Sequence, residues 1–195
     1  MKPEKTAILL IEFQKTWTEK GIFYKMIRKE LTKRNVLINT KEVVSAGRKQ
    51  GVKVIQAPLI LDKTDKERYK KTPFPARLLK RFTKGTWKAE FTDGIYESSD
   101  LVVKGRYGFD ACEGSDLEQL LKENGIENVF VCGFTTDHCV KETMNSLTDK
   151  GFHCVLVSGC TATRNFKLQK KIENEFETIS SEKLIKEIGE TMNKN

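Results

Sequence analysis

Short runs of consecutive apolar residues recur along the chain, and each is followed by a glycine, a polar residue or a charge. Uninterrupted runs of this kind are typical of strands that are buried on both faces, as in parallel sheets. We expect five such strands, with Glu177–Ser180 as a short sixth. The five predicted strands are Thr6–Glu12, Val52–Ala57, Leu101–Lys104, Val129–Gly133 and Cys154–Ser158.

Segments with helical signals alternate with these strands. Ser115 and Glu118 form a capping-box pattern, and glycines such as Gly125 end several of the segments. A repeated order of strand, helix, helix-ending glycine and strand indicates βαβ units with right-handed crossovers. We therefore predict an α/β fold with three α/β/α layers, a doubly wound, mostly parallel sheet of about six strands, and one domain over residues 1–195. The predicted helices are Asn35–Lys49, Ser115–Asn124, Thr136–Lys150 and Ser181–Ile188.

The segment Leu59–Gly85 shows no clear period, contains prolines and lysines, and is predicted to be an excursion from the sheet edge. The net charge of +8 is spread along the chain, and the densest basic stretch, Asp62–Lys71, also holds acids. A solvated loop or helix face therefore explains this stretch better than a nucleic-acid patch. No apolar run approaches the roughly 18–20 residues that span a bilayer. We expect no nucleic-acid or membrane partner.

The five cysteines include no pair spaced C-x-x-C, and their number is odd. This pattern predicts neither a disulfide framework nor a zinc knuckle. Free thiols fit a reducing compartment, and the apolar start of the chain is too short for a signal peptide, so we expect a cytoplasmic protein.

Three chemically suggestive residues follow predicted strands. Glu12 and Lys104 each close a strand, and Cys139 follows the fourth strand at the opening of a helix. Loops at the carboxyl ends of parallel strands carry the ligand site in such folds. A helix N-terminus and a nearby lysine would lower the pKa of a thiol, and a carboxylate could accept its proton.

Each of these residues also has a plain structural interpretation. A charge that ends a strand is often only a solvated stop, and a cysteine is often inert packing. The two histidines offer a weaker route, because His138 adjoins Cys139 and neighbours on a helix do not face each other. A cysteine–histidine pair is therefore not favoured.

Four motifs, in order and in matching strand context, resemble the isochorismatase-like cysteine hydrolase superfamily, which includes nicotinamidases and N-carbamoylsarcosine amidases. The resemblance extends over most of the chain. The motifs are Ile11–Gln14, Gly85–Trp87, Val102–Lys104 followed by Tyr107–Phe109, and Gly133–Val140.

The resemblance implies a catalytic triad of acid, lysine and cysteine, which falls on Glu12, Lys104 and Cys139. It also implies a cis peptide between Phe134 and Thr135, with an oxyanion hole made by the backbone N–H groups of Thr135 and Cys139. The implied activity is cleavage of a C–N bond in a small amide or ureide through a thioester. Four aromatic residues would either wall the substrate pocket or pack in the core: Trp17, Trp87, Tyr107 and Phe109.

The chain departs from the family pattern at two places. Glu12 stands where most members carry aspartate, and Gln56–Leu59 replaces the metal motif of nicotinamidases. We therefore expect no metal and no cofactor. The resemblance further implies a homo-oligomer, a dimer or tetramer. An alternative is a catalytically silent fold that binds a metabolite or a partner, with Glu12 marking the loss of activity.

Overall fold

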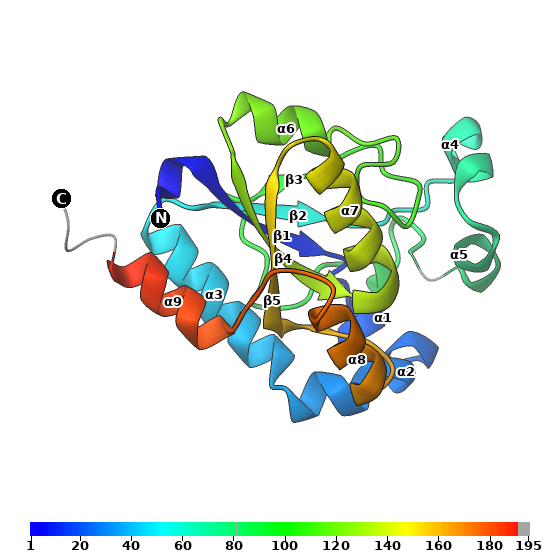
Figure 1. Ribbon diagram of the computed structural model, residues 1–195. Helices are drawn as coiled ribbons and strands as arrows, with labels where there is room; N and C mark the ends of the chain where they lie inside the picture. The colour runs from blue at the N-terminus through cyan, green and yellow to red at the C-terminus, as the bar shows by residue number, and fades with distance from the viewer. Residues whose placement is uncertain (81, 191–195) are drawn as a thin grey trace.

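The protein is built around one six-stranded sheet in which all paired strands run parallel. The computed structural model describes residues 1–80 and 82–190. The strand order β3-β2-β1-β4-β5-β6 shows that the chain builds one half outward from β1 and then returns to β4, beside β1, to build the other (Figure 1). This is the predicted doubly wound topology. The strands are β1 (Thr6–Ile11), β2 (Lys53–Ala57), β3 (Leu101–Val102), β4 (Asn128–Phe134), β5 (His153–Ala162) and β6 (Thr178–Ile179).

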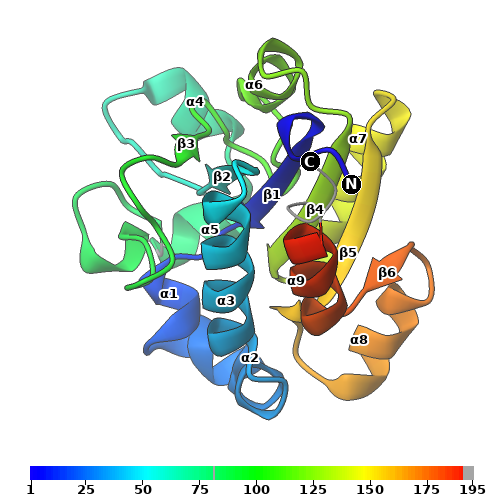
Figure 2. The same ribbon diagram turned by 90° about the vertical axis from the view of Figure 1, so that its left-hand side faces the viewer.

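Helices cover both faces of the sheet and give the predicted three α/β/α layers. Figure 2 shows α3 and α9 side by side in front of the sheet, and α2 packs against α3 on the same side. Helices α6 and α7 cover the opposite face. The helices are α1 (Lys15–Thr18), α2 (Ile22–Lys33), α3 (Val36–Lys49), α4 (Lys66–Lys71), α5 (Phe74–Leu79), α6 (Leu117–Glu123), α7 (Lys141–Asp149), α8 (Phe166–Glu173) and α9 (Ser181–Glu190), with the short turns η1 (Pro3–Lys5), η2 (Trp87–Ala89) and η3 (Thr136–Val140).

The central strand β1 is buried along its whole length because its side chains feed two apolar clusters. Ile8 and Leu10 point to the face covered by α2, α3 and α9, and Leu9 points to the face covered by α6 and α7. A Cβ at Gly47 of α3 would lie 2.5 Å from the Ile8 side chain. The absence of a side chain at Gly47 therefore lets α3 approach the sheet closely.

Several predicted boundaries differ from those of the structure. Strand β3 ends at Val102, two residues before the predicted end. The predicted helix Thr136–Lys150 begins as a single π-helical turn, η3, and continues as α7. The capping box is wrong, because Asp116 is the cap of α6 and Glu118 pairs with Lys122 instead.

The segment Leu59–Gly85 leaves the carboxyl end of β2 and returns, with Leu61 bridged to Thr83. It carries α4 and α5 and is described except for Arg81. The side chain of Asp65 caps α4 by accepting a hydrogen bond from the backbone N–H of Arg68. Among the described helices, none combines the length and the apolar character that crossing a bilayer requires.

Candidate active site

The candidate site lies where β1 and β4 run side by side, the point at which the sheet changes its winding direction (Figure 1). Ligands in doubly wound folds bind at this crevice. Glu12 follows β1 directly, and Cys139 lies in η3, directly after β4. A Cβ at Gly133 would sit 2.2 Å from the backbone oxygen of Ile11, so only glycine allows the two strand ends to approach this closely.

Glu12 is held in an uncommon backbone conformation, with a φ of 58°. A left-handed conformation is unfavourable for a residue with a side chain, so the surrounding structure must hold it in place. Its backbone N–H donates to the carbonyl of Ala57 at 3.2 Å, and its side chain is buried. One carboxylate oxygen, Oε2, accepts a hydrogen bond of 2.9 Å from the indole N–H of Trp17.

The other carboxylate oxygen of Glu12 pairs with Arg106, whose Nη2 lies 2.6 Å from Oε1. The rest of the guanidinium is also engaged, since it donates to the carbonyls of Ala57, Gly108 and Phe109. Arg106 is only 2% exposed. These contacts compensate the burial of its charge and fix its orientation.

The structure places Lys104, the residue assigned to the triad by resemblance, outside the cavity that Glu12 and Cys139 line. Lys104 is exposed and borders a separate hollow beside Asp62. Strand β3 has already ended, and Gly105, with a φ of 90°, turns the chain against Gly114. Arg106, two residues further along, is the cation that contacts Glu12.

Cys139 is 4% exposed and faces the same cavity as Glu12. Burial raises the pKa of the Cys139 thiol well above its ordinary value, and the charge of Glu12 and a hydrogen bond to its carboxylate raise it further. Arg106 acts in the opposite direction and lowers the pKa. The pKa of the thiol is therefore raised and not lowered as expected, because burial and the Glu12 carboxylate outweigh the effect of Arg106.

The peptide bond between Phe134 and Thr135 is cis, as the resemblance predicts. The carbonyl of Thr135 accepts hydrogen bonds from the backbone N–H groups of His138, at 3.1 Å, and Val140, at 3.2 Å. These bonds close the turn that presents Cys139. Thr135 and Cys139 both line the cavity.

A cavity of about 190 Å³ opens onto these groups. Trp17 and Phe109 line it, as expected, whereas Trp87 and Tyr107 do not. The ring of Trp87 packs under the ammonium group of Lys20, and other positions supply the remaining walls. The lining residues that sequence reasoning did not identify are Phe23, Met26, Leu59, Ala76, Phe82 and His138.

The position of the metal motif in nicotinamidases is occupied here by a structural contact. Gln56 is buried and donates to the carboxylate of Asp100, which also pairs with Arg48. Across the described residues, no group of three histidine, cysteine or acidic side chains is placed to hold a metal ion.

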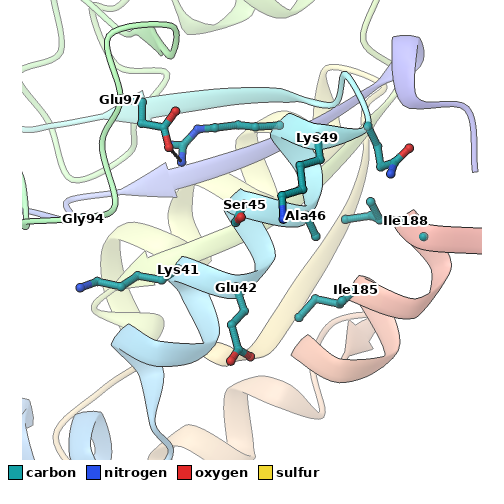
Figure 3. A pocket seen from close by; sticks show the side chains of 12 residues that line it. Lys41, Glu42, Ser45, Ala46, Lys49, Gly94, Glu97, Ile185 and Ile188 are labelled. Carbon is teal, nitrogen blue, oxygen red and sulfur yellow. Dashed lines mark hydrogen bonds and ion pairs between the residues drawn. The ribbon is translucent and has the colours of Figure 1, made fainter.

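A larger and more open hollow, of about 660 Å³, lies along α3 and α9, away from the strand ends. Figure 3 shows Ile185 and Ile188 of α9 facing α3, while Lys41 and Glu42 extend outward. Of its cations, Lys41 and Lys49 are exposed and Arg48 is paired with Asp100, and no cysteine is among the described lining residues. Glu12 and Cys139, the candidate catalytic residues, line the smaller cavity instead.

The fold and this arrangement define a class: a three-layer α/β protein with an acid, a guanidinium and a cysteine converging at the topological switch point. The chain belongs to the isochorismatase family, because the model of the isochorismatase domain matches residues 6–181.

Curated relatives include proteins with and without an assigned activity. A probable inactive nicotinamidase of Arabidopsis thaliana is 27% identical over 144 residues, which cover 71% of this chain and 70% of that protein. The ureidoacrylate amidohydrolase RutB of Acinetobacter baylyi is 23% identical, and the match covers 74% of this chain and 65% of that protein.

Solved structures show the same fold. A cysteine hydrolase from Pseudomonas syringae pv. phaseolicola superposes with a TM-score of 0.83 at 18% identity, covering 97% of this chain and 95% of that one. An N-carbamoylsarcosine amidase from Thermoplasma acidophilum gives a TM-score of 0.73 at 20% identity, covering 91% and 96%.

Proposed function

We propose that the protein is a cysteine hydrolase that cleaves the C–N bond of a small amide or ureide through a thioester on Cys139. The observation that carries this proposal is the buried contact of Glu12 with both Arg106 and the Cys139 thiol at one end of a single cavity. A carboxylate next to a thiol can act as the base that removes the thiol proton, and a cysteine nucleophile is activated in this way. Membership of a hydrolase family supports the same reaction class.

In the first half of the reaction, Glu12 takes the thiol proton as the Cys139 sulfur attacks the substrate carbonyl carbon. The carbonyl oxygen gains the negative charge, and the backbone N–H groups of Thr135 and Cys139 would stabilise it. Each such donor contributes about 3–4 kcal/mol in known oxyanion holes. Glu12 then gives its proton to the leaving nitrogen, the C–N bond breaks, and the amine or ammonia departs.

In the second half, Glu12 removes a proton from a water molecule, which attacks the thioester carbon. The C–S bond breaks, the acid product leaves, and the proton held by Glu12 returns to the sulfur. Arg106 neither gives nor takes a proton in this scheme. Its role is to hold the Glu12 carboxylate in place and to offset the negative charge that moves between Glu12 and Cys139.

A direct experiment is a screen of small amides and ureides for released ammonia, with the Cys139→Ser variant as the control. The proposal predicts release by the wild type that the serine variant loses. Equal release by both proteins would contradict it.

The second candidate, a silent fold that binds a metabolite, is favoured by one observation: Arg106 replaces the lysine that the resemblance implies. This alternative predicts saturable binding of an amide with no product formed. The expected dimer or tetramer and the cytoplasmic location stay predictions.

A further inference from the structure

The residues that line the cavity beside Cys139 fall into a polar set, here called the polar end, and an apolar set, the apolar end. The polar end consists of Glu12, Thr135, His138 and Cys139 and includes the groups of the proposed mechanism. The remaining lining side chains are apolar. A reactive amide group would therefore meet the polar end, and the rest of the acyl group would contact hydrocarbon.

Three aromatic rings make the apolar end a preorganised wall. Trp17 stacks on Phe23, with ring centroids 4.5 Å apart, and Phe23 contacts Phe82 at 5.8 Å. The only polar atom of Trp17, its indole N–H, is already bound to Glu12. The wall consequently offers ring faces and edges to a ligand.

The charges near the cavity disfavour an anionic ligand. Of the described residues that line it, none carries a lysine or arginine side chain, and the guanidinium of Arg106 is bound to Glu12 and to backbone carbonyls. Burial raises the pKa of Glu142, nearby His138 lowers it, and the charge of Asp110 raises it. Glu142 in turn lies close enough to Cys139 for its charge to raise the pKa of the thiol. Near the thiol, a second carboxylate would meet the carboxylates of Glu12 and Glu142, and among the described lining residues only His138 could offer it a positive charge.

We propose that the cavity takes a neutral hydrocarbon acyl group and discriminates against acyl groups that carry a carboxylate. This inference rests on the proposed function. The cavity volume of about 190 Å³ limits the size of the acyl group. A dry cavity of about 150 Å³ holds benzene, so the site accommodates about one six-membered ring with its carboxamide.

The test compares isosteric substrates by the rate of ammonia release. 4-Methylpentanamide and succinamate differ only in an isopropyl group against a carboxylate, and benzamide and cyclohexanecarboxamide test the ring size. We expect kcat/KM for 4-methylpentanamide to exceed that for succinamate by roughly 100-fold or more, because burying an unpaired charge is so unfavourable. Equal or better hydrolysis of succinamate would overturn the inference and leave the proposed function standing.

A matched pair of variants tests the electrostatic cause. Met26 lines the cavity and is 43% exposed, whereas Ile22 lies one turn away on the same helix, outside the lining, and is 54% exposed. Met26→Lys should raise kcat/KM for succinamate by roughly tenfold relative to 4-methylpentanamide, and Ile22→Lys should leave the ratio unchanged. An equal change of this kcat/KM ratio in both variants would contradict the inference.

A binding arm separates this inference from the proposed reaction. Calorimetry with the Cys139→Ser variant should detect benzamide and 4-methylpentanamide, with succinamate bound at least about tenfold more weakly. Binding of the neutral amides without any turnover by the wild type would support the inference and contradict the hydrolase. Absence of both binding and turnover would contradict both.

Discussion

The guanidinium of Arg106 lies 2.6 Å from the carboxylate of Glu12, and both side chains are 1% exposed. The pair is therefore withdrawn from water, where its attraction is strong and where loss of one partner leaves a buried, uncompensated charge. Because Glu12 also bonds to Trp17, its carboxylate has one fixed position next to Cys139.

The first prediction distinguishes Arg106 from Lys104. Arg106→Lys keeps a positive charge but cannot make all of the guanidinium's contacts at once, so kcat/KM should fall by roughly 100-fold. Arg106→Met should lower it further. Lys104→Met should stay within about threefold of the wild type, since Lys104 is exposed and away from the cavity.

Thermal unfolding of each variant shows whether a loss of rate is only a loss of fold, and Arg106→Lys is the variant that best preserves the buried charge. A large loss of kcat/KM in Lys104→Met, together with a wild-type kcat/KM in Arg106→Lys, would contradict the role of Arg106 and return Lys104 to the triad.

The second prediction concerns the pH dependence of the Cys139 thiol. Its pKa is raised, so the fraction of thiolate keeps growing as the pH rises past the ordinary thiol value of about 8.5. The rate of alkylation by iodoacetamide, followed at Cys139 by peptide mapping, should therefore still increase at pH 9 without a plateau.

Two substitutions should move this rate in opposite directions. Glu12→Gln removes a charge that raises the thiol pKa, so labelling of Cys139 at pH 8 should become faster while turnover is lost. Arg106→Lys weakens an interaction that lowers the thiol pKa, so labelling of Cys139 should become slower. Slower labelling in Glu12→Gln would show that its carboxylate does not face the thiol.

The third prediction concerns the support behind the nucleophile turn. Gln169 is fully buried on α8, accepts a hydrogen bond from Thr136 and donates to Thr161. Gln169→Leu leaves both hydroxyl groups without this partner and should lower the free energy of unfolding by about 2 kcal/mol.

The matched control is Gln119→Leu, which removes an exposed contact with Glu123. It should change the free energy of unfolding by less than about 0.5 kcal/mol. Because Thr136 begins η3, Gln169→Leu should also lower turnover. Urea unfolding and ammonia release measure the two effects, and equal stability of both variants would remove Gln169 from this role.

The centre of the sheet could be predicted from the sequence because β1 and β4 are buried on both faces and therefore read as apolar runs. Helix α2 was not predicted, since only Ile27 and Leu31 are buried apolar residues along its length and charges surround them. The end of the two-residue strand β3 was also not predicted, because hydrophobicity alone does not show where the pairing of β3 with β2 stops.

The site was only partly predictable. Glu12 and Cys139 lie next to strand ends that apolar runs mark clearly, whereas Arg106 reaches Glu12 only because the chain turns at Gly105. Part of the cavity wall was missed because Ala76 and Phe82 come from a segment without periodicity. Their position depends on long-range packing, which local sequence patterns do not encode.

A thioester on Cys139 would be detected by quenching the protein with acid during turnover and measuring the mass of the protein. With a hydrolysed amide such as benzamide, the account predicts an added mass equal to the acyl group, mapped to Cys139 and absent in Cys139→Ser. An acyl group that accumulates should disappear on further incubation, as water releases the acid. Turnover that continues in Cys139→Ser, or an acyl group on another residue, would contradict the account.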